Sequence, residues 1–357
     1  MSNIVLIGAG QTGRGYLNRF FKDEKVTFLD IDSELIERLQ QEKKYNIFFG
    51  KQRETLTLDN FKAYTVDSKQ GLDALAQADL VMISVGQKNL DSLVPLIQKA
   101  LAIRQKGDVD ILTAENGVHT KNYLIPLCQD KRVHLAETIV FCTTLKQENS
   151  LDIFSEDLDY LPYDVVSLGH QLPYKHTVAE KNLSSLMQRK IYTYNCLSAV
   201  VTYLGYYKGY EEYAKAANDS EITMCMDNIL QKLNACICKE YEIDVDEQAK
   251  FSQMAVAKFQ NKAIVDTIER NARDVDRKLG ENERILAPLC ILKKYGKQSD
   301  ALLLVAACAV YYGQKTSTLL KSFEKYFEIL PKEWFTQIVD YLKKLDNQMT
   351  IIEVLSV

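Results

Sequence analysis

Two kinds of hydrophobic pattern alternate along the first half of the chain. Short apolar runs, typical of buried parallel strands, occupy residues 4–7, 26–29, 80–85, 109–113 and 133–142. Between them, apolar residues at helical spacing predict helices over 33–41, 72–77, 90–102 and 121–127. Residues 45–66 alternate with a period of two and predict an antiparallel insertion. This alternation predicts an α/β domain with a doubly wound parallel sheet of the Rossmann type.

The pattern changes after the middle of the chain. Residues 147–180 are rich in loops, and from about Asn182 a period near 3.6 continues to the end with few glycines or prolines. We therefore expect a Rossmann-type domain over residues 1–182 and an all-α domain over residues 183–357. A length of 357 residues agrees with two cores.

Composition narrows the possible partners. A net charge of −4 gives no support for binding nucleic acid or an anionic membrane surface. The longest apolar run, residues 301–312, is too short to span a bilayer. Since the first strand begins at residue 3 or 4, a signal peptide has no room, and we expect a cytoplasmic protein. The oligomeric state is left open.

The cysteines and histidines do not form a recognisable metal pattern. None of the eight cysteines forms a C-x-x-C pair, and none of the four histidines has helical ligand spacing. We expect neutral or buried thiols and no metal site.

A dinucleotide-binding fingerprint follows the first strand. The glycines of G-x-G-x-x-G are Gly8, Gly10 and Gly13, and a helical pattern begins at once after them. The three positions suit a tight turn, an approach to a pyrophosphate and close packing of helix on strand. Asp30 ends the second strand, 17 residues after Gly13, where an acid would hold the adenosine ribose. An acid there favours NAD over NADP, because a 2′-phosphate would meet a like charge.

Other residues join this expected cofactor site. Ligands of doubly wound sheets bind at the carboxyl ends of the strands, where Gly86 and Asn116 also lie. Arg14 directly follows the last fingerprint glycine. The expected cofactor-binding set is therefore Gly8, Gly10, Gly13, Arg14, Asp30, Gly86 and Asn116.

The helical half offers a candidate base. On a largely apolar helix, Lys190, Asn195 and Ser198 would share an arc of about 140° at 100° per residue. A desolvated lysine has a lowered pKa and suits general acid–base catalysis near neutrality. In the alternative interpretation, Lys190 reaches solvent along its stem and Asn195 satisfies a loop carbonyl.

Several motifs in order along the chain resemble one enzyme family. They are the Gly-Arg-Gly-Tyr of residues 13–16, Glu115-Asn116, the Lys190 and Asn195 pair, and a late block running from Lys258 to Pro288. Together they are similar to the metal-independent, polyol-specific long-chain dehydrogenases, the mannitol dehydrogenase family. The resemblance implies a Rossmann domain and a helical domain like that of 6-phosphogluconate dehydrogenase. It also implies Lys190 as general acid/base, with Asn116 and Asn195 stabilising the developing alkoxide.

The chain departs from the family pattern near the substrate. Ser198 stands where the family has His, Thr143-Thr144 where it has Asp-Arg, and Lys262 where Pro follows Asn261. We expect an NAD-dependent oxidoreductase that interconverts a polyol, or polyol phosphate, and a ketose, with Ser198 in the catalytic site. A divergent NAD-binding protein without turnover, or a reductase of a sugar-derived keto-acid, are the alternatives.

Three arginines could bind the anionic end of such a substrate. Arg270, Arg273 and Arg277 are spaced i, i+3, i+7 and would share one face of a helix. Arginines on one face would form a clamp for a phosphate or carboxylate. A solvated face whose charges pair with neighbouring acids is the alternative.

Overall fold

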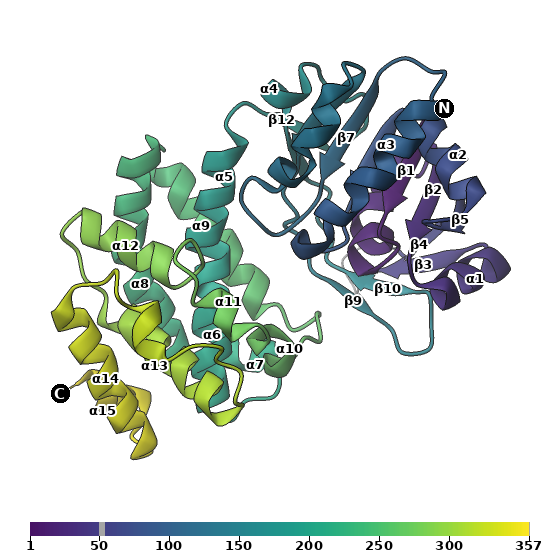
Figure 1. Ribbon diagram of the computed structural model, residues 1–357. Coiled ribbons are helices and arrows are strands. Elements are labelled where there is room, and N and C mark those ends of the chain that lie inside the picture. The colour runs from purple at the N-terminus through teal and green to yellow at the C-terminus, as the bar shows by residue number, and fades with distance from the viewer. Residues whose placement is uncertain (50–53, 357) are drawn as a thin grey trace. The chain divides into compact units, whose positions relative to one another are not determined.

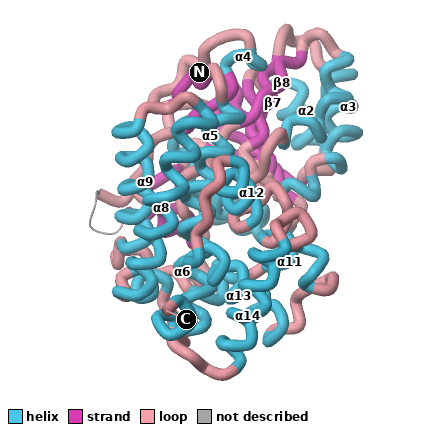
Figure 2. Tube along the Cα trace, turned by 90° about the vertical axis from the view of Figure 1, so that its left-hand side faces the viewer, coloured by secondary structure: helices cyan, strands magenta, loops and turns pink. Residues whose placement is uncertain are grey.

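The computed structural model describes residues 1–49 and 54–356, which divide into two compact units, Met1–Met187 and Gln188–Val357 (Figure 1). The strands gather in the first unit, and the second unit is built of helices (Figure 2). The boundary expected after residue 182 falls just before α5 (Leu183–Lys190), the helix within which the two units divide.

The first unit is organised on a six-stranded, fully parallel sheet. Its strands lie in the order β5-β2-β1-β6-β7-β8. They are β1 (Asn3–Ile7), β2 (Lys25–Asp30), β5 (Phe61–Thr65), β6 (Leu80–Ile83), β7 (Val109–Thr113) and β8 (Val133–Glu137). The chain reverses direction across the sheet between β1 and β6, which makes the carboxyl ends of these strands the usual ligand edge. The expected α/β architecture is confirmed.

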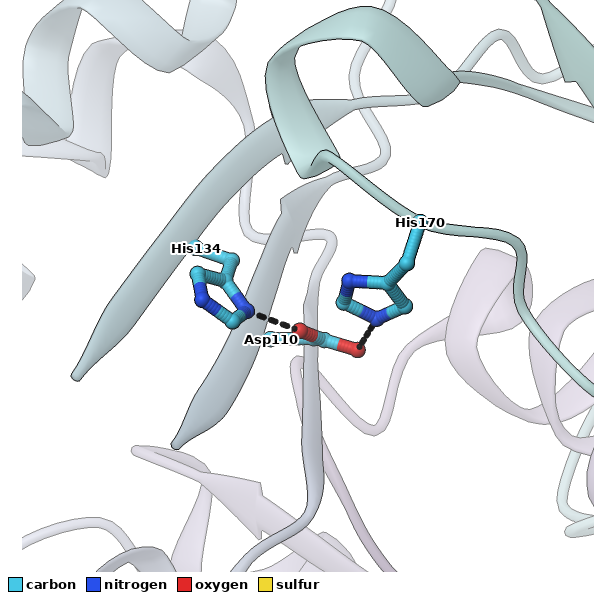
Figure 3. Close-up of side chains that lie close together, drawn as sticks. All are labelled: Asp110, His134 and His170. Atoms are coloured by element: carbon cyan, nitrogen blue, oxygen red, sulfur yellow. Dashed lines mark hydrogen bonds and ion pairs between the residues drawn. The ribbon is translucent and has the colours of Figure 1, made fainter. Parts of the chain in front are cut away.

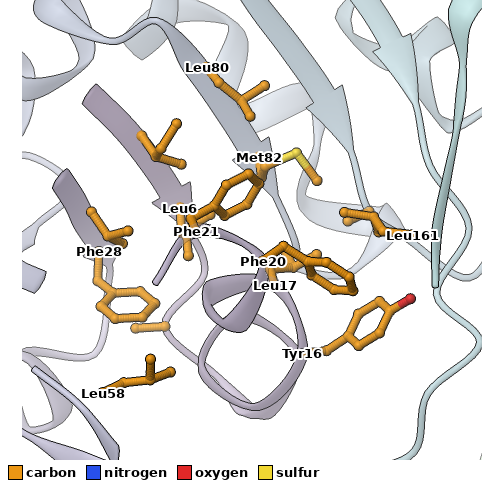
Figure 4. Close-up of a cluster of buried hydrophobic side chains, with 14 of the residues drawn as sticks. Leu6, Tyr16, Leu17, Phe20, Phe21, Phe28, Leu58, Leu80, Met82 and Leu161 are labelled. Atoms are coloured by element: carbon orange, nitrogen blue, oxygen red, sulfur yellow. The ribbon is translucent and has the colours of Figure 1, made fainter. Parts of the chain in front are cut away.

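Helical segments cover both faces of this sheet. Successive side chains of a strand point to opposite faces, so the apolar strands present hydrophobic side chains on each face. On one face, Val5, Val81 and Ile111 pack with α2 (Lys69–Gln77), α3 (Val94–Ile103) and the 3₁₀ turns of Thr120–Gln129. On the other face, Leu6 and Phe28 pack against the turns of Gly13–Phe21 and α1 (Ser33–Glu42), as Figure 4 shows for the turns.

The predicted insertion over residues 45–66 is only partly antiparallel. β3 (Tyr45–Phe48) does pair antiparallel with β4 (Leu56–Leu58), although residues 50–53 lie outside the described chain. β5, however, is a parallel edge strand of the main sheet, so this part of the prediction was wrong. β3 also pairs in parallel with β10 (Ile153–Ser155), whose other neighbour is β9 (Thr144–Lys146). A period of two in the sequence predicts which side chains of a strand are buried. It does not predict which strand lies next to it or in which direction that strand runs.

Other segments differ at their ends. The helix expected over 90–102 begins at Val94, after two 3₁₀ turns, and residues 121–127 are 3₁₀ rather than α-helical. The strand expected over 133–142 ends at Glu137, and that over 80–85 ends at Ile83. Beyond β8, β11 (Leu161–Asp164) pairs in parallel with β12 (Thr177–Glu180) across the short helix α4 (Val165–Leu168).

The second unit is helical as expected. It comprises α6 (Cys196–Tyr207), α7 (Tyr213–Ala217), α8 (Ser220–Tyr241), α9 (Val245–Gln260), α10 (Ile268–Ala272), α11 (Val275–Lys278), α12 (Leu286–Lys294), α13 (Asp300–Lys315), α14 (Lys332–Asp346) and α15 (Ile351–Leu355). The apolar run noted in the sequence forms α13, which is buried on all sides from Ala301 to Val310 and packs against α6, α8 and α14. Among the described residues, no helix has both the length and the apolarity needed to cross a bilayer.

The absence of a side chain at Gly15 allows the four-stranded sheet, with the order β4-β3-β10-β9, to pack against the turn of the glycine fingerprint. A Cβ at this position would lie 2.3 Å from Cγ2 of Ile153 and 3.0 Å from Cγ2 of Thr144. Since Ile153 is fully buried, it has no room to move away. We expect Gly15→Ala to lower the free energy of unfolding by about 1–3 kcal/mol through overpacking. Urea unfolding of the full chain measures this, with Gly107→Ala, whose Cβ meets nothing within 4 Å, as the control. Equal midpoints for the two variants would contradict the packing role.

Candidate active site

The fingerprint glycines form the loop that the sequence predicts. Gly8 has φ of +100°, and a Cβ there would lie 2.3 Å from the Ser84 carbonyl oxygen. A Cβ on Gly13 would lie 2.0 Å from the carbonyl oxygen of Gly8, so only glycine allows helix and strand this close. At Gly10 a Cβ would meet no atom within 4 Å, so the backbone there faces open space. This loop fits a dinucleotide, since the open position is the one that approaches the pyrophosphate.

The acid at the end of β2 is held by backbone groups. The Ala9 N–H donates to Oδ2 of Asp30 over 2.6 Å, and the Asp32 N–H donates to Oδ1 over 3.0 Å. The carboxylate is thereby fixed beside the glycine loop, at the end of the strand next to β1. This is the position from which an acid accepts hydrogen bonds from the adenosine ribose hydroxyls.

Arg14 lies beneath the loop rather than on its open side. Its side chain is only 2% exposed, and Nη1 donates to the Ala9 carbonyl oxygen over 2.9 Å. Burial lowers the pKa of this guanidinium, and the neighbouring Arg38 lowers it further. The Tyr45 hydroxyl donates to the Arg14 carbonyl and fixes the same turn from β3. Arg14 therefore shapes the cofactor loop from below.

A buried glutamate links two more strand ends. Oε1 of Glu115 accepts hydrogen bonds from the N–H groups of Val85 and Gly86, over 2.7 and 2.8 Å. Burial raises the pKa of Glu115 to about 7, although these two donors act in the opposite direction. Gly86, with φ of +88°, and the exposed Asn116 are thus positioned by one carboxyl group at the ends of β6 and β7. The Glu115-Asn116 motif alone does not predict this role of Glu115.

In the second unit, Lys190 is almost fully buried. It ends α5 and is 5% exposed. Burial, together with the charges of Lys258 and Arg284, lowers the pKa of Lys190 to about 7, and the charge of Glu283 acts in the opposite direction. A lysine with this pKa exchanges protons near neutral pH, as a general acid/base requires.

The helix carrying Lys190 is not uniform. Residues Ile191–Asn195 form a π-helical turn between α5 and α6, so the 100° spacing used for the predicted arc does not apply between Lys190 and Asn195. That part of the prediction was wrong. π-turns inside helices occur frequently at functional sites. This one directly follows Lys190 and ends at Asn195, the two residues of this helix to which the family resemblance gives catalytic roles.

Gln248 of α9 stabilises the π-turn from both sides. Its Oε1 accepts from Nε of Arg189 over 2.7 Å, and its Nε2 donates to Oγ1 of Thr193 over 3.1 Å. Arg189 also forms an ion pair with Glu247 and lies over the ring of Phe251. Gln248 is fully buried, so its hydrogen bonds link α9 to side chains before and within the π-turn in a low-dielectric environment.

Positive charge gathers around Arg284. Burial, together with the charges of Arg284 and Arg277, lowers the pKa of Lys278 to about 7, and the charges of Asp274 and Glu283 act in the opposite direction. Nζ of Lys278 donates to the Asn271 carbonyl oxygen, which is neutral. Since Arg284 also lowers the pKa of Lys190, it is the common neighbour of two buried lysines. The spacing along the sequence does not group Lys278 and Arg284 with Lys190.

The expected arginine clamp does not share one helix face. Asp274 adopts a left-handed conformation with φ of +59° and separates α10 from α11. This break makes the i, i+3, i+7 argument wrong. Each arginine lies instead beside its own acid: Arg270 with Asp266, Arg273 with Glu269 and Arg277 with Glu283.

The positions that depart from the family pattern have ordinary local roles. Ser198 lies on α6 beside the buried Tyr213 phenol, whose pKa burial raises above its usual range. The Thr143 N–H donates to the Glu156 carboxylate just before β9. Asn261 follows α9 and accepts a hydrogen bond from the Ala263 N–H.

Of the eight free cysteines, Cys128 is exposed, and burial raises the thiol pKa at six others, which agrees with neutral thiols.

Comparison with known proteins gives one consistent result. The chain matches the mannitol dehydrogenase Rossmann domain over residues 2–146 and the mannitol dehydrogenase C-terminal domain over residues 182–326. A mannitol-1-phosphate 5-dehydrogenase from Thermoanaerobacter pseudethanolicus is 27% identical, with 83% of this chain and 82% of the relative covered.

Solved structures share the fold. Mannitol 2-dehydrogenase from Pseudomonas fluorescens, in a ternary complex with NAD and D-mannitol, superposes with a TM-score of 0.70 at 16% identity, covering 87% of this chain and 79% of that one. A ketopantoate reductase from Ralstonia eutropha JMP134 reaches 0.55 at 14% identity, covering 88% and 99% of the two chains. The family matches favour the polyol enzyme over the keto-acid reductase.

The Rossmann unit, its glycine loop and these matches define an NAD-dependent oxidoreductase acting on a CH–OH group. The chain belongs to the mannitol dehydrogenase family, whose two domain models between them cover most of its length.

The fixed carboxylate of Asp30 predicts the cofactor preference. NADH should bind more tightly than NADPH, because a 2′-phosphate would meet a negative charge. Asp30→Ala should weaken NADH binding about tenfold or more, since hydrogen bonds to a charged group are lost. The same change should reduce the preference for NADH over NADPH. Isothermal titration calorimetry measures both, with the exposed Asp73→Ala as control. Tighter binding of NADPH to the unmodified protein would contradict this role of Asp30.

Proposed function

We propose that this protein interconverts a polyol phosphate and the corresponding ketose phosphate, as its mannitol-1-phosphate 5-dehydrogenase relatives are named for doing. The observation that carries the proposal is Lys190, a buried amine with a pKa of about 7 beside further buried positive charge. A group of buried cations stabilises an anionic ligand, and a titratable amine among them provides the acid/base.

In the oxidation direction, the neutral amine of Lys190 accepts the proton of the substrate hydroxyl. Bound NAD supplies the hydride acceptor. The family resemblance assigns to the side-chain N–H groups of Asn116 and Asn195 the stabilisation of the negative charge that develops on the substrate oxygen. In the reduction direction, the Lys190 ammonium returns the proton to the carbonyl oxygen. Ser198 supplies a hydroxyl near the reacting group, where it acts as hydrogen-bond donor or acceptor but not as a proton store.

The substrate phosphate binds at the buried cations rather than at a shared arginine face. Arg273 is 65% exposed and its partner Glu269 is 83% exposed, so this pair is solvated. Arg270 is neutralised by Asp266. Lys278 is buried beside the positive charges of Arg284 and Arg277, and its Nζ donates to the neutral Asn271 carbonyl oxygen. Glu283, which pairs with both arginines, offsets these charges only in part. A phosphate bound there would offset the free-energy cost of holding the Lys278 ammonium away from water.

We also place the enzyme in the cytoplasm, because turnover needs a maintained pool of NAD. The acid at position 30 is consistent with use of that pool.

The lowered pKa of Lys190 predicts opposite pH profiles for the two directions. Oxidation needs the neutral amine, so kcat/KM for the polyol phosphate should rise with pH and level off above about 7. Ketose reduction needs the ammonium and should decline as pH rises through the same value. Lys190→Met should lower kcat at least about a hundredfold while NADH affinity changes little.

The control for this change is Lys250→Met, which removes an exposed lysine from α9. Its rates and pH profile should match those of the unmodified protein. If Lys190→Met keeps full activity with an unchanged pH profile, Lys190 is not the acid/base. If the unmodified protein binds NADH but turns over no polyol, polyol phosphate or keto-acid, the proposed reaction is wrong.

The phosphate site predicts a contrast between two substitutions. Lys278→Met should reduce the preference for a phosphorylated over a free polyol about ten- to a hundredfold, as expected for the loss of a charge-assisted hydrogen bond. Arg273→Met should leave that preference unchanged, because Arg273 is solvated. The measurement is kcat/KM for mannitol 1-phosphate and for mannitol in each variant. A loss confined to Arg273→Met would favour the arginine face that the sequence suggested.

A further inference from the structure

A group of three side chains lies at the other end of the main sheet from the cofactor loop. Asp110 and His134 are the second residues of β7 and β8, and they are direct partners in the register of these parallel strands. Their side chains therefore leave the same face of the sheet, next to one another. Along β7, Asp110 precedes Thr113, at the carboxyl end, by three residues, or roughly 10 Å.

His170 completes the group from a separate segment (Figure 3). It directly follows Gly169, whose left-handed conformation ends α4 and whose N–H donates to the Val165 carbonyl oxygen. Two residues later, the Leu172 N–H donates to the Tyr163 hydroxyl over 2.8 Å. His170 is thus held between two fixed points, and its ring is directed toward Asp110.

The two imidazoles share one carboxylate. Nδ1 of His134 lies 3.0 Å from Oδ1 of Asp110, and Nε2 of His170 lies 2.9 Å from Oδ2. The two rings meet edge to face, with centroids 5.3 Å apart. One nitrogen or oxygen from each of the three residues lies within 4.8 Å of the others. Ligand atoms around a tetrahedral Zn²⁺ with bonds of about 2.0–2.2 Å stand at similar separations, so small side-chain rotations suffice.

We propose that Asp110, His134 and His170 form a binding site for a divalent transition-metal ion, with Zn²⁺ the best fit. Two imidazoles and a carboxylate are ligands that Zn²⁺ accepts, and hard cations such as Mg²⁺ prefer oxygen ligands. The side chains of Asp110, His134 and His170 are 15%, 33% and 44% exposed. The ion therefore reaches the site from solvent, and water completes its coordination.

Binding requires the imidazole protons to move. In the metal-free protein, the two ring nitrogens that face Asp110 donate their protons to its carboxylate. To bind the ion, each nitrogen offers a lone pair, so its proton passes to the other ring nitrogen or to solvent. The carboxylate then contributes one negative charge to the site. Because the group lies away from the cofactor edge, its role is to tie the segment after α4 to the edge of the sheet.

Spacing along the sequence does not indicate this site. The three ligands are separated by 24 and 36 residues, and only the register of β7 with β8 and the course of the chain after α4 bring them together. A search for ligands at helical spacing could not find them.

The test is a titration of the full chain with Zn²⁺ after removal of bound metal by a chelator. All proteins carry Cys128→Ser, because Cys128 is an exposed thiol that would bind zinc itself. Calorimetry should show one saturable site of low-micromolar affinity or tighter, and Tm should rise with added Zn²⁺ by a few degrees. Co²⁺ in place of Zn²⁺ should give a spectrum without thiolate charge transfer.

Two variants and a matched control decide the assignment. His170→Asn and Asp110→Asn should each weaken Zn²⁺ binding at least tenfold and abolish the rise in Tm. His176→Asn makes the same change at an exposed histidine with φ of +65°, a conformation that Asn tolerates, and should bind as the parent does. Tm without metal reports whether each variant folds. The proposal is overturned if the Cys128→Ser protein shows no saturable Zn²⁺ binding, or if all variants bind Zn²⁺ equally. Neither result depends on dehydrogenase activity.

Discussion

Burying the amine of Lys190 is the constraint on which the second unit depends. A lysine removed from water favours its neutral form, and the positive charges nearby strengthen that preference. A π-turn follows this lysine, and Gln248 bonds to the side chains of Arg189 before the turn and of Thr193 within it. The segment that carries this buried amine is therefore linked by side-chain hydrogen bonds to α9.

In the first unit, the main constraint is that backbone atoms must come close to a charged ligand. Glycine at positions 8 and 13 allows strand, loop and helix to approach within contact, and Gly10 leaves the loop open on its outer side. Asp30 and Glu115 then use carboxylate oxygens to hold neighbouring loops through backbone N–H groups. Arg14 supports the loop from inside the core. Rigid strand ends, rather than a flexible loop, thus fix the geometry at this edge of the sheet.

The sequence predicted features that depend on local spacing and missed those that depend on distant contacts. The glycine loop, the parallel strands and the helical half follow from periodicity and were confirmed by the structure. The parallel pairing of β5, the π-turn after Lys190 and the left-handed Asp274 do not follow from it, because each is set by tertiary packing or by one backbone conformation. The same holds for Glu115 and for the cluster around Arg284, whose pKa shifts arise from burial that spacing does not reveal.

The contact of Gly15 with Ile153 also bears on the order of events during synthesis. The nucleotide-binding turn lies near the amino end of the chain, yet the residue that packs against it is made more than a hundred residues later. The first βα unit emerging from a ribosome therefore has an unfilled surface at Gly15 until β9 and β10 have also emerged. Contacts of this sequence separation slow folding, since a long loop must close before they form. The cofactor loop of this enzyme is encoded first but completed late.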